Sequence, residues 1–202
     1  MKLNAVEMLL VNNPVRTVVQ RLYEARLLLE LGGRLDGARV LEIGCGRGVG
    51  VEILLEQFGA SQVYAIEIEP EQLRRAERRL AAYIGRRAML ALEGAEYLPF
   101  ADQYFDAVVD FGVLHHVSRW QTAVTEIRRV LKPGGRFFFE EVTRDALNRW
   151  LYRTLLEHPA ENRFSEAEFV AELAAHAIEL LQEPWRILAN DIFIGVGQYR
   201  QR

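Results

Sequence analysis

The sequence is poor in cysteine: Cys45 is the only one among 202 residues. A single thiol excludes an intramolecular disulfide, and it also excludes a metal site built from several cysteines. We therefore predict no bound metal. Proteins that use cysteine so sparingly are typical of reducing compartments, so the expected location is the cytoplasm.

Long apolar runs and an excess of positive charge are also missing. No stretch approaches the roughly 20 consecutive apolar residues that a membrane-spanning helix needs, and the first 16 residues are too polar for a signal peptide. The formal net charge is −3, whereas domains that grip nucleic acid are usually clearly basic. We expect no membrane span and no nucleic-acid partner, and the sequence predicts nothing about oligomeric state.

Hydrophobic residues are abundant, at 50% of the chain, so one domain of this length can bury a sizeable core. An amphipathic helix is predicted over residues 17–31, ended by Gly32 and Gly33, with an apolar stripe formed by Val18, Val19, Leu22, Ala25, Leu28 and Leu29. Strands are then predicted at 39–43, 62–68, 88–92, 105–114 and 136–142, and helices at 49–58, 70–84 and 119–131.

The alternation of these elements predicts the fold class. Strands that are apolar throughout and alternate with helices indicate a parallel sheet covered on both faces. Further on, helices are expected around 145–156 and 165–175, and strands at 178–187 and 191–199 that pair as an antiparallel hairpin. The prediction is a single doubly wound α/β fold with a mostly parallel seven-stranded sheet, helices on both faces and a C-terminal antiparallel hairpin.

A glycine-rich run follows the first predicted strand and reads Glu42-Ile43-Gly44-Cys45-Gly46-Arg47-Gly48. Glycines at alternate positions let the backbone approach a ligand closely, and the helix that follows directs free N–H groups at it. The dinucleotide pattern G-x-G-x-x-G/A is not met, because its third position falls on Val49 or Val51. A turn that merely joins a strand to a helix stays as the alternative.

An acidic residue stands where a ribose-binding group is expected. Glu67 ends the second predicted strand, about 20 residues past the glycines, where a carboxylate can accept both ribose hydroxyls. Glu69 is the competing acid. We interpret Glu69 as the N-cap of the next helix, with Pro70 at the first helical position.

Three later segments complete a pattern. They read Glu93-Gly94-Ala95-Glu96-Tyr97-Leu98-Pro99-Phe100, then Phe111-Gly112-Val113-Leu114-His115-His116-Val117, then Val130-Leu131-Lys132-Pro133-Gly134-Gly135-Arg136. With the glycine run, they resemble class I S-adenosylmethionine-dependent methyltransferases, in the small-molecule branch that includes the ubiquinone and menaquinone methyltransferases. The resemblance covers roughly residues 37–142.

The resemblance implies S-adenosyl-L-methionine as cofactor and a role for each matching residue. The methionyl part would meet Glu42, Gly44, Cys45, Gly46 and Gly48, the ribose Glu67, the adenine Ile68, Gly94, Ala95 and Glu96, and the sulfonium side Asp110, Phe111 and Gly112. Family members commonly carry Asp where this chain has Gly94, so Glu93, Glu96, water or backbone would have to meet the adenine amino group.

The reaction implied is methyl transfer to a small-molecule acceptor. Candidates for a general base are His115, His116, Glu140 and Glu141. Since neighbours on a strand point to opposite faces, only one residue of each pair should face the acceptor. The alternatives are an RNA or protein methyltransferase and a catalytically silent protein that binds the cofactor.

The segments outside the resemblance are expected to shape the acceptor pocket. We predict an N-terminal helical cap at 1–36, with Tyr23 and Arg26, and a Rossmann-like methyltransferase domain at 37–202. Within it, 143–177 would be a helical insertion on the substrate side, including the aromatic-rich stretch of Trp150, Tyr152, His158 and Phe164.

Overall fold

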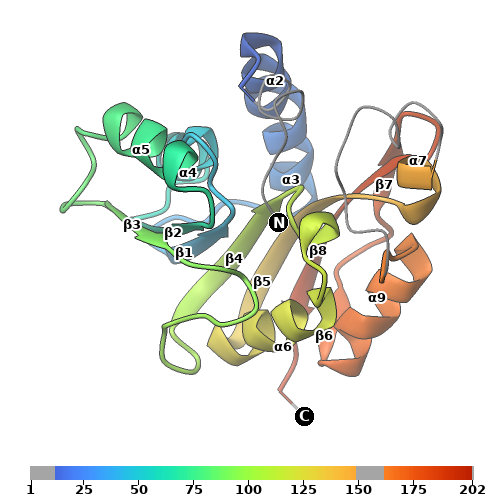
Figure 1. Ribbon diagram of the computed structural model, residues 1–202. Helices are drawn as coiled ribbons and strands as arrows, with labels where there is room; N and C mark the ends of the chain where they lie inside the picture. Colours follow the sequence, from blue (N-terminus) through green and yellow to red (C-terminus); the bar gives the residue numbers. More distant parts are fainter. Residues whose placement is uncertain (1–11, 149–161, 202) are drawn as a thin grey trace.

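A mixed eight-stranded sheet forms the centre of the computed structural model, which describes residues 12–148 and 162–201 (Figure 1). The strands are β1 (Arg39–Ile43), β2 (Gln62–Glu67), β3 (Ala88–Leu92), β4 (Phe105–Phe111), β5 (Leu131–Val142), β6 (Ile178–Leu180), β7 (Trp185–Ile187) and β8 (Ile192–Tyr199). Their order is β3-β2-β1-β4-β5-β8-β6, and β7 also pairs with β8.

The first five strands are parallel, so their carboxyl ends share one edge of the sheet. Ile43 at the end of β1 is in register with Ile66 of β2 and with Asp110 of β4. The order of the strands reverses between β1 and β4, and ligands of open α/β sheets bind just beyond the carboxyl ends at such a reversal.

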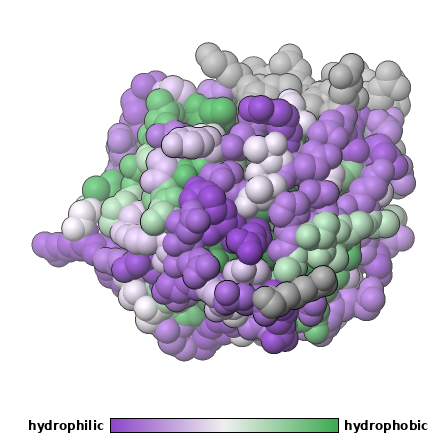
Figure 2. All heavy atoms as spheres, turned by 90° about the horizontal axis from the view of Figure 1, so that it is seen from below, coloured by the Kyte–Doolittle hydropathy of each residue, from purple (hydrophilic) through white to green (hydrophobic). Residues whose placement is uncertain are grey.

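Helices cover both faces of the sheet, as predicted (Figure 1). One face carries α3 (Ala25–Gly32), α4 (Val49–Glu56) and α5 (Pro70–Arg79), and the other carries α6 (Trp120–Val130) and α9 (Glu166–Ala175). In β5, Phe138 enters the first core, while Phe137 and Phe139 enter the second. Seen from the side of α6 and α9, the outer surface is largely hydrophilic (Figure 2). No helix in the described ranges is long and apolar enough to cross a membrane.

The C-terminal strands differ in one respect from the prediction. The expected strand at 178–187 is interrupted around Pro184, which has no N–H for a sheet hydrogen bond. The two pieces, β6 and β7, both pair antiparallel with β8, and β8 pairs antiparallel with β5. The sheet therefore has eight strands rather than seven, and the antiparallel C-terminal pairing is confirmed.

The N-terminal helix is continuous but not regular. It consists of α2 (Pro14–Val19), the π-helical turn η1 (Gln20–Glu24) and α3. The predicted apolar stripe is wrong at its start, since Val18 and Leu22 are 54% and 66% exposed. The stripe is confirmed at Ala25 and Leu28, which are buried, and the buried face also carries Glu24. The wider π-turn shifts the phase of the helix between its two ends.

Three other predicted boundaries were wrong, and one of them is the start of β5, which lies at Leu131 and not at 136. The helix predicted over 70–84 stops at Arg79, after which the chain forms tight turns that return to Leu80. The strand predicted over 105–114 ends at Phe111, because Gly112 adopts a φ of 82° and turns the chain out of the sheet. Residues Leu114–His116 then form the short 3₁₀ turn η2.

The predicted helix at 145–156 is described only at its start, as α7 (Arg144–Asn148). Trp150, Tyr152 and His158 lie outside the described residues.

Candidate functional site

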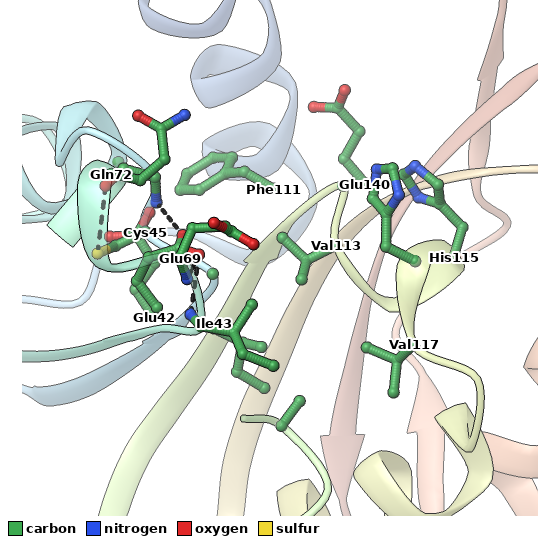
Figure 3. Close-up of a pocket in the computed structure, with 18 of the residues that line it drawn as sticks. Glu42, Ile43, Cys45, Glu69, Gln72, Phe111, Val113, His115, Val117 and Glu140 are labelled. Carbon is green, nitrogen blue, oxygen red and sulfur yellow. Dashed lines mark hydrogen bonds between the residues drawn. The ribbon is translucent and has the colours of Figure 1, made fainter. Parts of the chain in front are cut away.

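A cavity of about 990 Å³ lies at the carboxyl ends of β1, β2 and β4 and extends to α2 and η1. It is the place that the strand order indicates. The predicted site residues that line it are Glu42, Gly44, Cys45, Gly46, Glu67, Ile68, Gly94, Ala95, Glu96, Phe111, Gly112, His115, His116 and Glu140. Glu42 and Cys45 lie at one end, and His115 and Glu140 at the other (Figure 3).

Three predicted residues do not line this cavity. Gly48 is the N-cap of α4, and a Cβ there would meet Leu80 of the neighbouring turn. Asp110 is fully buried and accepts a hydrogen bond from the N–H of Val113. Glu141 is also fully buried. These residues lie behind the wall of the cavity rather than in it.

Besides Gly48, close approaches require glycine at Gly44 in the loop and at Gly50 in α4. Gly44 has a φ of 65°, and a Cβ there would lie 2.5 Å from Cγ2 of Val113, so only glycine lets β1 turn beneath the loop after β4. A Cβ at Gly50 would lie 1.9 Å from Oε1 of Glu42. The absence of a side chain at Gly50 thus makes room for the Glu42 carboxyl between β1 and α4.

The Glu42 carboxyl is buried without compensation. Its Oε2 has no hydrogen-bond partner among the described residues. Burial, and next the charges of Glu67 and Asp110, raise the pKa of Glu42 to about 8. The carboxyl is therefore largely neutral at pH 7, and a cationic group placed against it would favour its ionised form.

Glu67 closes the other side of the loop. Its Oε2 accepts the N–H of Gly46 at 2.8 Å, and its Oε1 accepts the N–H groups of Ile68 and Glu69, both at 2.8 Å. Burial raises the pKa of Glu67, and these three donors oppose that shift. Glu69 is at the N-cap of α5, as predicted, although its side chain makes no capping bond.

The segment after β3 forms the rim beside Ile68. Glu96 accepts hydrogen bonds from the N–H of Arg119 at 3.2 Å and from its Nη2 at 2.7 Å, so this carboxylate is already engaged. A Cβ on Gly94 would lie 3.7 Å from Cδ1 of Ile68, which is an ordinary contact. A side chain at position 94 therefore has room.

The far end of the cavity holds the base candidates. The prediction that His115 and His116 point to opposite faces was wrong, since both line the cavity with ring centroids 4.2 Å apart. The reason is that they belong to η2 and not to a strand. The alternation of Glu140 and Glu141 does hold in β5, because Glu140 lines the cavity and Glu141 does not.

An ion cluster beside Glu140 was not predicted. Arg16 of α2 pairs with Glu24 of η1 and, at 3.3 Å, with Oε1 of Glu140. Burial, and next the charge of Glu24, raise the pKa of Glu140 well above its usual range. An acid on the buried helix face next to Ala25 was the one signal in the sequence that could have revealed this cluster.

Two further residues were missed at the glycine-loop end. The guanidinium of Arg47 donates to the carbonyls of Asn12 and Asn13, at 2.7 Å and 3.1 Å, and to Oγ1 of Thr17, and so ties the loop to the start of α2. Gln72 of α5 is 1% exposed and lines the cavity. No pattern in the sequence around Arg47 or Gln72 indicates that either residue lies at the cavity.

Comparison with known proteins decides the family. Residues 41–139, which carry the glycine loop, Glu67 and the turn after β4, match the family model described as "Methyltransferase domain". The chain belongs to the class I S-adenosylmethionine-dependent methyltransferases. Among solved structures, this methyltransferase is similar to an S-adenosylmethionine-dependent methyltransferase from Aquifex aeolicus, with a TM-score of 0.75, 18% identity and coverage of 98% and 100% of the two chains.

Curated relatives of the methyltransferase differ in acceptor. It is 30% identical to a malonyl-[acyl-carrier protein] O-methyltransferase of Halorhodospira halophila, over 76% of this chain and 56% of that one. It is 40% identical to a ubiquinone/menaquinone biosynthesis C-methyltransferase of Bordetella avium, over 54% of this chain and 43% of that one. The chain spans about half the length of the curated relatives it matches.

Proposed function

We propose that this protein transfers a methyl group from S-adenosylmethionine to a small-molecule acceptor. The observation that carries the proposal is one continuous cavity, with the glycine loop and two acids at one end and polar groups able to meet an acceptor at the other. Relatives named as fatty-acid and ubiquinone/menaquinone methyltransferases support a small molecule. The fold alone does not, because a similar solved structure is a [4+2]-cyclase.

The residues present fit the cofactor. The carboxyl oxygen of Glu42 that lacks a partner suits the methionyl ammonium, beside the loop of Gly44 and Gly46. Ile68 and the backbone of Ala95 would meet the adenine. When bound, the cofactor supplies a methyl group on a positively charged sulfonium.

Glu67 would hold the ribose hydroxyls, but it would have to weaken one of its present hydrogen bonds to do so. An ionised carboxylate offers roughly four acceptor sites, and three backbone N–H groups already use this one. Accepting two hydroxyls therefore requires one of these backbone bonds to lengthen, which would couple ribose binding to the position of the glycine loop.

The protein would contribute to the reaction by positioning the acceptor and by excluding water from the cavity. Phe111 and Gly112 line the cavity between its two ends. His116 and Glu140 are candidate contacts to the acceptor. Holding an acceptor in line and excluding water can supply several kcal/mol of the barrier. The N-terminal helix, with the segment at 143–177, would shape the acceptor end.

Calorimetry tests the part of the proposal that concerns cofactor binding. We expect one S-adenosylmethionine or S-adenosylhomocysteine per chain and no measurable binding of NAD. Binding of NAD alone would overturn the proposal. Incubation of the protein with cell extract and methyl-labelled cofactor tests the other half: label in the small-molecule fraction supports it, and label confined to RNA or protein would contradict it. No transfer to any fraction would instead favour a silent binding protein.

Replacing Gly94 tests the adenine contact. Gly94→Asp restores an acceptor where relatives of this family commonly have one, and it has room to fit. We expect the affinity for S-adenosylmethionine to rise by about 1 kcal/mol, the usual net value of one hydrogen bond. Gly94→Ala is the matched control and should leave the affinity unchanged. Equal affinities for all three proteins would show that Glu93 or a water already meets the adenine.

A further inference from the structure

The side chain of Gln72 is buried without a hydrogen bond. Gln72 belongs to the first turn of α5, is 1% exposed and lines the cavity. Neither Oε1 nor Nε2 of its amide has a hydrogen-bond partner in the part of the chain that the structure describes. An unpaired buried amide costs folding stability, so a polar residue at this position calls for a reason other than packing.

Gln72 lies on the face of α5 that packs on the glycine loop. The Cα of Ala76 is 3.3 Å from the point where a Cβ on Gly48 would stand, so this face of the helix touches the loop. Gln72 is one turn nearer the start of α5, and its amide lies beyond the loop, past the carboxyl ends of the strands (Figure 3). A Cβ on Gly46 would meet nothing within 4 Å. The space over the middle of the loop is therefore open to a ligand.

Glu67 borders the same space. Its Oε2 accepts the N–H of Gly46 at 2.8 Å, and Glu67, Gly46 and Gln72 line the cavity together. An ionised carboxylate can only accept hydrogen bonds, whereas a hydroxyl both donates and accepts. The amide of Gln72 offers the donor that the carboxylate of Glu67 lacks.

We propose that Gln72 is a cofactor-binding residue whose Nε2 donates to the oxygen of one ribose hydroxyl, while the proton of that hydroxyl goes to Glu67. The inference rests on the proposed function, because it takes the ribose to lie against Glu67. Rotation about the side-chain bonds of Gln72 turns the amide from its buried position to the open space over Gly46. Cofactor binding thereby pairs an amide that is unpaired in the ligand-free protein.

The charges around Gln72 favour a hydroxyl over the other polar groups of the cofactor. The methionyl ammonium is matched better by Glu42, whose carboxyl has a free oxygen. The methionyl carboxylate would be repelled here by the acid Glu67. A ribose hydroxyl is neutral, so it needs one donor and one acceptor but no opposite charge.

The experiment removes the amide and the hydroxyls in turn. Gln72→Met keeps the length of the side chain but has neither the donor nor the amide oxygen. Calorimetry gives its affinity for S-adenosylhomocysteine and for the two analogues that lack the 2′ or the 3′ hydroxyl. We expect about a three- to tenfold loss for S-adenosylhomocysteine, the usual effect of one hydrogen bond. With one of the two analogues, the variant and the wild type should bind equally, because the hydroxyl that Gln72 meets is gone.

Two further variants sharpen the test. Gln57→Met, at the end of α4 and outside the lining of the cavity, is the matched control and should bind S-adenosylhomocysteine like the wild type. Gln72→Glu keeps the size of the side chain but loses the donor and adds a second carboxylate beside Glu67. Its affinity should therefore fall below that of Gln72→Met.

Folding stability separates a ligand contact from a structural role. In the ligand-free protein, Gln72→Met replaces an unpaired amide by an apolar group, so the urea midpoint should rise while the affinity for S-adenosylhomocysteine falls. A lower midpoint with unchanged affinity would assign Gln72 to the fold and overturn the inference. A loss of affinity that persists with both analogues would also overturn it, and both results leave the proposed function standing. Failure of S-adenosylhomocysteine to bind the wild type contradicts the proposed function itself.

Discussion

The ligand-free protein should lose roughly 5 kcal/mol of folding stability at Glu42 alone as the pH rises from 4.5 to about 8. The pKa of Glu42 is raised in the folded protein, so between these two values the native state holds a proton that the unfolded chain has lost. Each pH unit in that window then costs about 1.4 kcal/mol of stability. Stability from this residue is greatest below pH 4.5 and stops falling above about 8.

Urea unfolding across this pH range, with Glu42→Gln as the comparison, measures the effect. Glutamine cannot ionise, so the variant should lose the part of the slope that belongs to Glu42, including the effect of its charge on Glu67 and Asp110. Parallel curves for the two proteins would show that Glu42 is already ionised without ligand. A second measurement uses the cofactor: binding near pH 7 should release a proton from the wild type and none from Glu42→Gln, which calorimetry in buffers of different ionisation heat detects.

The second large effect is expected at Glu67. Glu67→Ala should weaken S-adenosylmethionine binding by roughly 2–4 kcal/mol, because it removes a charge-assisted pair of hydrogen bonds to the ribose. It also leaves the N–H groups of Gly46, Ile68 and Glu69 without their carboxylate. Calorimetric titration measures the loss.

Two further variants separate these causes. Glu67→Gln keeps one acceptor oxygen for the loop but removes the charge, so its affinity should lie between those of the wild type and Glu67→Ala. Glu69→Ala should bind within about twofold of the wild type, because its side chain makes no capping bond. If Glu69→Ala is the variant that loses affinity, the ribose acid has been misidentified.

The sequence predicted the cofactor half of this cavity well, because that half is built by local geometry. A glycine loop directly after a buried strand, and an acid at the end of the next parallel strand, must meet at one edge of the sheet. The placement of Glu42, Gly44 and Glu67 around one cavity follows from strand order and spacing. Their contacts with the cofactor stay predictions.

The acceptor half could not be predicted, because it depends on contacts between distant segments. Arg16 and Glu140 are 124 positions apart, and the phase of the helix that brings Arg16 there depends on a π-turn with no sequence signature. His115 was expected on a strand, and only the turn at Gly112 places it beside His116. The contact between Nδ1 of His115 and Oε2 of Glu141 could not be predicted either, because it depends on the backbone of η2.

The π-turn at Gln20–Glu24 offers a way to alter the acceptor end of the cavity while α3 keeps its place on the sheet. One α-helical residue corresponds to a rotation of about 100°, since a turn takes 3.6 residues. Deleting one residue within η1 would therefore swing Arg16 away from Glu140 by about a quarter of a turn, while α3 stays anchored on β5 and β8. Glu67 and the glycines of the loop lie on other elements, and only Arg47 of the loop would lose its bonds to Asn13 and Thr17. A lineage could therefore exchange one acceptor for another by gaining or losing a single helical residue, with a change at Arg47 as the main adjustment in its cofactor site.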